Sequence, residues 1–223
     1  MYRNYFQLHG LDPSGKSVVL PDEDDREHFI NLLNLLCPDS NFMTGADGNV
    51  TSGLGTCFGP SATFPTSCSC LAAAINSPCI IEIKRARRSI GDIIKGIPAR
   101  PTTVGNCCKD GKVTVYVSEF GGTVLGWPTI PGNYPPLPEP PPPFDDELPG
   151  SHPTKRLPDV PLPTPEFIVL AHELCGHAIT GWQHPDDPTR YTCEDPVVKL
   201  ENCVREEHST PTCDYGVRNG HVW

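Results

Sequence analysis

The sequence predicts an α+β fold in which two helices pack across each other beside a small β-sheet, with long proline-rich segments left irregular. Three observations lead to this prediction. Two stretches of the C-terminal part carry helix-start signals, one central stretch alternates polar and apolar residues, and the chain holds 27 prolines and 20 glycines. A chain of 223 residues can bury one sizeable core, and this much proline and glycine indicates extensive loops around it.

The clearest helix is expected to begin at Thr164-Pro165-Glu166, where a hydroxyl residue takes the N-cap, proline the first helical position and an acid the first turn. Gly181 can end this helix. Its apolar face consists of Phe167, Leu170, Ala171, Leu174, Ala178 and Ile179. The histidines of the segment, His172 and His177, therefore belong to a helix with one buried side.

A second helix is expected to begin at Asp195-Pro196, with the same N-cap and proline signals. Its apolar stripe consists of Val197, Leu200 and Val204. Glu201 lies within this stripe. A carboxylate there needs a partner, because burying an uncompensated charge is costly.

The N-terminal region predicts a third helix followed by a loop. Apolar residues from Phe29 to Leu36 recur at helical spacing, so a helix is expected to follow Asp24-Asp25 and to end near Cys37-Pro38. Residues 39–70 are rich in Gly, Ser, Thr and Asn. We expect a loop there.

The middle of the chain predicts one or two further helices and one strand. Alanines and isoleucines over residues 69–97 favour helices, with Lys84, Arg85, Arg87 and Arg88 on a solvated face. The best strand candidate is Lys112–Phe120, because β-branched and aromatic residues alternate there with polar ones.

These elements divide the chain into four parts. They are a lead-in at residues 1–22, the N-terminal part of the folded domain at 23–130, a proline-rich strap or linker at 131–163, and the two helices with a C-terminal tail at 164–223. The third part holds about half of the 27 prolines and is expected to be extended. It could dock an SH3-type partner, although a spacer or surface strap is the commoner use of such a stretch.

The charge balance excludes some partners. The formal net charge is -10, so we expect no nucleic-acid partner and no attraction to anionic lipid. No apolar run reaches about 18 residues, so no membrane span is expected. The first residues lack the apolar core of a signal peptide, which predicts secretion or delivery by another route, or else a cytoplasmic location.

Eleven cysteines is a high number for this length, and Cys57, Cys68, Cys70 and Cys79 lie close together in sequence. They could form disulfides or remain as buried thiols in a reducing cell. Since the total is odd, at least one thiol is free or pairs between molecules.

The segment HELCGH holds the residues that indicate chemistry. His172 and His177 are metal-ligand types, and Glu173 follows the first of them as the base does in the H-E-x-x-H zinc motif. Here, however, the histidines are five residues apart. On a regular helix five residues turn through about 500°, which leaves the two rings about 140° apart. A shared metal therefore requires a local π-type widening, which we expect at Gly176.

HELCGH resembles the HELLGH zinc motif of dipeptidyl peptidase III, and residues 201–206, ENCVRE, resemble its EECRAE segment. The resemblance covers only these two short segments. It implies a zincin-like site with Zn2+ held by His172 and His177 and with Glu201 as the third ligand. Glu206 and Glu207 are alternatives for that third ligand.

A longer resemblance spans FIVLAHELCGHAITGWQHP and VVKLENCVREEHSTP, which look like the HELxGHA and EN-x-x-R-x-E-H pattern of metallopeptidase toxin domains in RHS-type and other polymorphic toxin proteins. The N-terminal stretch through Asp12-Pro13-Ser14-Gly15 is similar to the DPxG signature that closes an RHS core. The resemblance implies a C-terminal toxin or effector domain and a possible immunity protein as partner.

A zinc-dependent metallopeptidase is thus the predicted function, with protein or peptide substrates. Glu173 is expected to take a proton from water and to return it to the leaving amine. His208 lies two turns after Glu201 and is expected to stabilise the oxyanion or to orient Glu201. His184 and Tyr191 are further candidates for the oxyanion.

Two minor expectations and two alternatives complete the prediction. The strand at 112–120 is a candidate edge strand on which an extended peptide aligns. Cys175 is expected to be a small packing residue, with a nucleophilic thiol beside His177 as a remote alternative. The alternative functions are a non-catalytic RHS-associated binding module with structural zinc and a cysteine-rich secreted structural protein.

Overall fold

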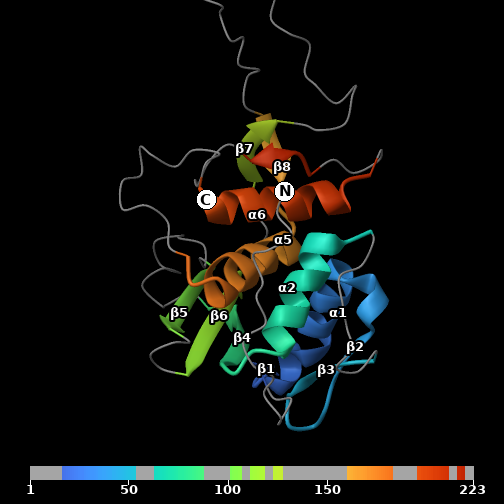
Figure 1. The fold of residues 1–223 in the computed structure, drawn as a ribbon, viewed down its shortest axis with the longest axis vertical. Coiled ribbons are helices and arrows are strands. Elements are labelled where there is room, and N and C mark those ends of the chain that lie inside the picture. The colour runs from blue at the N-terminus through green and yellow to red at the C-terminus, as the bar shows by residue number, and fades with distance from the viewer. Residues whose placement is uncertain are drawn as a thin grey trace, which may run out of the picture.

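The computed structural model describes residues 17–53, 63–87, 101–106, 111–118, 123–127, 160–182, 195–210 and 215–218. Within these ranges the expected α+β class is confirmed. Figure 1 shows the strands β4, β5 and β6 on one side and the helices α1 and α2 on the other, with α5 between them and α6 beyond it.

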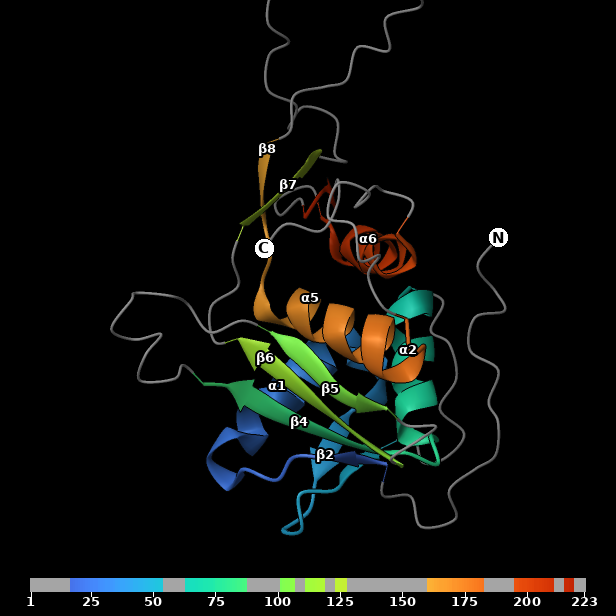
Figure 2. The ribbon, with the colours of Figure 1, turned by 90° about the vertical axis from the view of Figure 1, so that its left-hand side faces the viewer.

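The main sheet has four strands in the order β1-β4-β6-β5. Their bounds are β1 Val18–Val19, β4 Ile80–Ala86, β5 Thr102–Asn106 and β6 Lys112–Ser118. β1 pairs parallel with β4. β4 and β6 also run parallel, and β5 pairs antiparallel with β6 (Figure 2). The strand expected at 112–120 is therefore confirmed, but the expectation that it forms an edge is wrong, because β5 lies outside it.

The helices expected over residues 69–97 are only partly present. The helix α2 spans Pro65–Ile75, whereas the isoleucine-rich stretch that follows is the strand β4. In β4 the buried residues Ile81 and Ile83 alternate with partly exposed Glu82 and Lys84. This is the period of two that a strand with one covered face requires, and β-branched residues favour it.

The remaining helices follow their sequence signals. α1 spans Arg26–Leu36 after the 3-10 turn η1 at Glu23–Asp25, and α6 spans Pro196–His208. The Asp195 side chain accepts hydrogen bonds from the backbone N–H groups of Val197 and Val198, which confirms the predicted N-cap.

α5 spans Glu166–Ala171 and continues without a break into the π-helix η4 at His172–Ile179. Its N-cap is Pro165, not the expected Thr164. The Thr164 hydroxyl instead accepts a hydrogen bond of 2.8 Å from Arg205. Gly181 follows the C-cap residue Thr180 of η4 and has a φ of 69°, a conformation that favours glycine and ends the helix as predicted.

Three segments expected to be irregular contribute strands. The 39–70 loop contains the hairpin β2 Phe42–Thr44 and β3 Val50–Ser52, after the 3-10 turn η2 at Pro38–Ser40. The lead-in supplies β1, and the strap ends in β8 at Val160–Pro163, which pairs with β7 Thr123–Trp127. β9 at Val217–Arg218 completes a sheet of order β8-β7-β9. The predictions for residues 1–16 and 131–159 fall outside the described residues.

Two disulfides tie α2 to its neighbours. Cys68 bonds to Cys37 at the end of α1, and Cys70 bonds to Cys175 in η4. Cys79 is also disulfide-bonded, while Cys203 is the free cysteine of the described residues. Of the two alternatives left open by the sequence, the structure thus contains the disulfides.

Candidate metal centre

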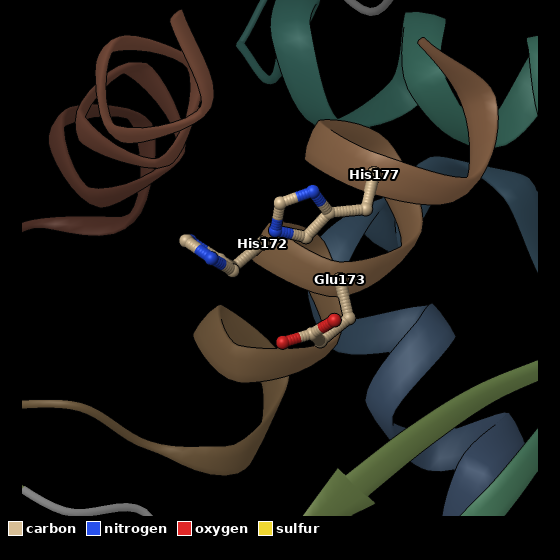
Figure 3. Close-up of side chains that lie close together, drawn as sticks. All are labelled: His172, Glu173 and His177. Atoms are coloured by element: carbon tan, nitrogen blue, oxygen red, sulfur yellow. The ribbon is translucent and has the colours of Figure 1, made fainter. Parts of the chain in front are cut away.

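The π-helix η4 brings together the three residues of the HELCGH segment that could hold a metal ion. One donor atom each from His172, Glu173 and His177 lies within 4.8 Å of the other two. Figure 3 shows these three side chains on their helix. The two imidazole rings are 5.1 Å apart between centroids and inclined by 73°. His172 and Glu173 are buried, whereas His177 is partly exposed.

The π-helical backbone explains why histidines five residues apart can meet. Its hydrogen bonds run from residue i to residue i+5, so residue 177 returns above residue 172. The predicted widening of the helix is therefore confirmed, although it extends over His172–Ile179 and is not a single bulge.

Gly176 lies within the widened segment, as expected, and also has a role in helix packing. A Cβ atom at this position would lie 2.3 Å from Cγ1 of Val197 in α6. Real Cβ atoms do not come this close to another carbon, so only glycine lets the two helices pack at this distance. Gly176 thus sets the approach of α6 to the metal-binding group.

Glu201 reaches His172 from α6. Its Oε2 lies 2.7 Å from Nδ1 of His172, and neither side chain is exposed to solvent. The same carboxylate accepts hydrogen bonds of 2.7 Å from Arg205 and 2.6 Å from Arg218. Burial acts to raise the pKa of Glu201, but Arg218, Arg205 and His172 together hold it well below its usual range.

The expected third ligand is therefore next to the group but outside it. Glu201 contacts the Nδ1 atom of His172, and its two oxygens also accept hydrogen bonds from Arg205 and Arg218. Of the alternatives, Glu206 is exposed. Glu207 accepts hydrogen bonds from the backbone and hydroxyl of Ser67 at 3.0 and 2.7 Å, which caps the first turn of α2. None of the three joins the His172, Glu173 and His177 donors, so third-ligand status stays a prediction.

The second histidine is oriented by the chain that follows it. Nδ1 of His177 lies 2.7 Å from the backbone carbonyl of Trp182, just beyond the end of η4. Both histidines therefore use Nδ1 for a hydrogen bond within the protein, one to a carboxylate and one to a carbonyl. Such bonds fix the tautomer and the orientation of the ring.

Glu173 is held by the edge strand. The hydroxyl of Thr103 in β5 lies 2.8 Å from its Oε2 and 3.1 Å from its backbone carbonyl oxygen. Burial raises the pKa of Glu173 to about 7, although the hydrogen bond from Thr103 acts in the opposite direction. No sequence pattern around Thr103 indicated this contact, because it depends on how the sheet meets η4.

Arg205 and Arg218 were also missed. Arg205 could have been found, since it follows Glu201 by four residues and so lies on the same helix face. Arg218 comes from β9, and nothing in the sequence links it to Glu201.

His208 lies away from the position expected for a catalytic residue. Its ring packs between Phe64 and Phe167, with centroid distances of 4.7 and 5.0 Å, and Nε2 lies 3.4 Å from the Ser67 hydroxyl. Burial lowers the pKa of His208, against an opposing effect of Glu207. The structure does not bring this ring to the His172, Glu173 and His177 group. His184 and Tyr191 lie outside the described residues.

Cys175 is bonded to Cys70, which removes the alternative of a nucleophilic thiol beside His177. It is also more than the small packing residue that the sequence predicted.

Comparison with known protein families, with characterised proteins and with solved structures found no match for this chain. Over the described ranges, none of the helices combines the length and the apolar character needed to cross a bilayer.

Proposed function

We propose that this protein is a zinc-dependent metallopeptidase, with zinc bound by His172 and His177 and with Glu173 as the catalytic base. The observation that supports it most directly is the convergence of these three side chains on one π-helix. Histidine nitrogen is a preferred zinc donor, and a glutamate beside the first ligand is suited to act on water at the same point.

The surroundings of the histidines fit zinc. Histidines that bind zinc through one ring nitrogen commonly donate the N–H of the other ring nitrogen to a carboxylate or a backbone carbonyl. Here Glu201 and the Trp182 carbonyl take those places, each at 2.7 Å. The metal would then bind through Nε2 of both rings. The proposal therefore assigns Glu201 to the orientation of His172, in place of the third-ligand role that the sequence predicted for it.

Zinc held by His172 and His177 would supply Lewis-acid chemistry for water and the substrate carbonyl. Glu173 accepts a proton from that water and delivers it to the amine of the leaving group. Thr103 holds the carboxylate in place through its hydroxyl. This division of roles uses only side chains that the fold already brings together.

The edge strand supports a peptide as the substrate. β5 lies at one end of the main sheet, and its residue Thr103 contacts Glu173. Among the described strands, only β6 pairs with β5. An extended peptide that pairs with the other side of β5 would therefore pass beside the base. The strand that the sequence assigned to this role, β6, is interior and is replaced by β5 in the proposal.

The biological setting is proposed from the resemblance to RHS-associated toxin domains. In that setting the chain is an effector domain that acts after secretion or delivery, with an immunity protein as a possible partner. The disulfides of the described residues fit this setting, because such bonds persist in oxidising compartments.

Metal analysis and hydrolysis assays on single variants test the proposal. We expect about one zinc ion per chain, lost in His172→Ala and His177→Ala but retained in the control His28→Ala on α1. Glu173→Gln should keep zinc and lose hydrolysis of an unfolded protein substrate by at least about a thousandfold, while Glu206→Gln on the exposed side of α6 should change neither.

The Glu173→Gln variant also separates the proposal from its main alternative. If Glu173 were a third ligand of a closed structural zinc site, the variant would bind zinc markedly more weakly and the wild type would cleave nothing. Zinc retained together with lost hydrolysis supports the base. Hydrolysis that persists in Glu173→Gln contradicts it.

A further inference from the structure

The Cys70–Cys175 disulfide enters the metal-binding segment itself. Cys175 lies between His172 and His177 in sequence, and its sulfur is bonded to Cys70 of α2. Both cysteines are buried, with exposed fractions of 0% and 1%. A covalent bond thus fixes the one stretch of backbone whose shape decides whether the two histidines meet.

The π-helical form of this stretch needs such a restraint. A π-helix is rare, and the α-helix is the ordinary state of a helical chain. If η4 returned to α-helical spacing, the two rings would turn about 140° apart and could not share a metal. Any contact that favours the π form over the α form therefore favours the metal-binding arrangement.

α2 provides a firm support for this restraint. A second disulfide joins Cys68 of α2 to Cys37 at the end of α1. Glu207 of α6 caps the first turn of α2 through Ser67. Since α2 is held at both its neighbours, the bond from Cys70 fixes Cys175 relative to the core and not merely to a mobile helix.

We propose that the Cys70–Cys175 disulfide is a positioning element of the metal centre, so that the protein binds metal with full affinity only in its oxidised state. This inference rests on the proposed function, because it takes His172 and His177 to be the metal ligands. The step is a two-electron exchange, in which a dithiol reductant becomes a disulfide and Cys70 and Cys175 each gain a proton and become thiols.

Because both sulfurs are buried, metal affinity should depend on oxidation during folding more than on later reduction. A reductant reaches the bond only after α2 and η4 separate locally, so reduction of the folded protein is slow. Oxidation during folding then acts as a condition for assembly of the centre. In a reducing compartment the newly made chain folds without the bond and holds metal weakly.

Paired cysteine variants test this with a matched control. Cys70→Ala/Cys175→Ala removes the bond to η4, and Cys37→Ala/Cys68→Ala removes the other bond of α2. We measure zinc affinity by competition with a chelator, and the visible absorption of bound Co2+ as a report on ligand geometry. The first variant should bind zinc about tenfold to a hundredfold more weakly with an altered Co2+ spectrum, whereas the second should stay within about threefold of wild type.

A second measurement covers the case in which the first variant does not fold. Wild-type protein is treated with a dithiol, and the thiols are blocked by alkylation. Zinc affinity is then measured on this sample once its far-ultraviolet circular dichroism is found to match that of the oxidised protein. Alanine variants and alkylation both prevent the Cys175 thiolate from acting as a substitute ligand. Weaker binding by the reduced protein supports the inference when oxidised Cys37→Ala/Cys68→Ala still binds zinc within about threefold of wild type, because the loss then does not come from the other bond of α2.

The outcomes distinguish the inference from the function beneath it. Equal zinc affinities and Co2+ spectra in wild type and in Cys70→Ala/Cys175→Ala overturn the inference while leaving the proposed function intact. Equal losses in both paired variants also overturn it, since the effect would then be general stability. If oxidised wild type binds neither zinc nor Co2+, the proposed function is wrong and the inference falls with it.

Discussion

Glu201 accepts a hydrogen bond from Nδ1 of His172 at 2.7 Å, across the interface between α6 and η4, with both side chains fully buried. The contact joins the two helices that the sequence marked as functional. Because Arg205 and Arg218 form ion pairs with the carboxylate, it stays ionised in the interior and can orient the imidazole. Stability and the proposed metal binding should therefore depend on the same carboxylate.

Glu201→Gln is expected to weaken both properties. The change leaves two buried arginines without their counter-charge, which should lower the free energy of unfolding by about 3–5 kcal/mol. It also weakens the orientation of His172, which should reduce zinc affinity about tenfold to a hundredfold. Urea unfolding and chelator competition measure the two effects. The control Glu206→Gln, at an exposed position of the same helix, should change stability by less than about 0.5 kcal/mol.

Gly176→Ala should disrupt the packing of η4 on α6. The new methyl group would lie 2.3 Å from Cγ1 of Val197, so we expect a loss of about 1–3 kcal/mol in the free energy of unfolding. Val197→Ala removes that carbon, and the double variant should lose less than the sum of the single losses. Additive losses in the double-mutant cycle would show that the two side chains do not collide.

Thr103→Val tests the contact between the edge strand and the base. Valine keeps the shape of threonine but cannot donate a hydrogen bond to Glu173. We expect kcat for a peptide substrate to fall about tenfold with zinc affinity unchanged, since a bond to a charged group contributes about 1.5–3 kcal/mol. Thr102→Val, at the exposed neighbouring position of β5, should leave kcat unchanged.

His208→Phe tests the catalytic role that the sequence assigned to this histidine. Because its ring packs on Phe64 and Phe167, a phenylalanine should fill the same space and retain peptide hydrolysis within about threefold. A fall of a hundredfold or more in kcat, with the fold intact by circular dichroism, would restore the catalytic role and contradict the placement.

The pH dependence of stability is expected to include a contribution from Glu82. Burial acts to raise its pKa, but hydrogen bonds from Lys112 and Lys84 outweigh this effect and hold the pKa below 4.5. The folded state therefore favours the charged carboxylate. Glu82→Gln should lower the free energy of unfolding by about 1 kcal/mol at pH 7.

The sign of this effect fixes its pH window. Since the folded pKa of Glu82 is lower than the unfolded one, the stabilisation is complete above pH 4.5 and disappears as the pH falls through the folded value. Urea titrations of wild type and Glu82→Gln should thus converge in acid. A difference that grows in acid would contradict the pKa direction.

Part of the fold could be predicted because it depends on neighbours along the chain. The apolar spacing of α1, the Asp195 N-cap of α6 and the alternation in β6 are local signals, and the structure contains all three elements. Ile80–Ala86 was predicted as helix because isoleucine suits both helix and strand interiors. Its place between β1 and β6 decided the outcome.

The candidate site divides in the same way. The spacing of His172 and His177 required a widened helix, and the sequence alone determined that requirement. What only the tertiary structure decided is how the widening is held and which groups surround it. The tertiary contacts around the widened helix are the disulfide from Cys70 to Cys175 and the close approach of Val197 to Gly176. Thr103 also bonds to Glu173, and Arg218 bonds to Glu201.

The sequence by itself determined the helix that bears the histidines, its neighbour with Glu201, and a set of residue types that could hold a metal ion. The tertiary structure decided that Glu201 contacts Nδ1 of His172, that β5 is the last strand of the four-stranded sheet, and that His208 packs against aromatic rings. The physical reason is the distance along the chain over which each interaction acts. Helix periodicity and capping act over a few residues, whereas sheet order and side-chain pairing depend on segments that meet only when the chain has folded.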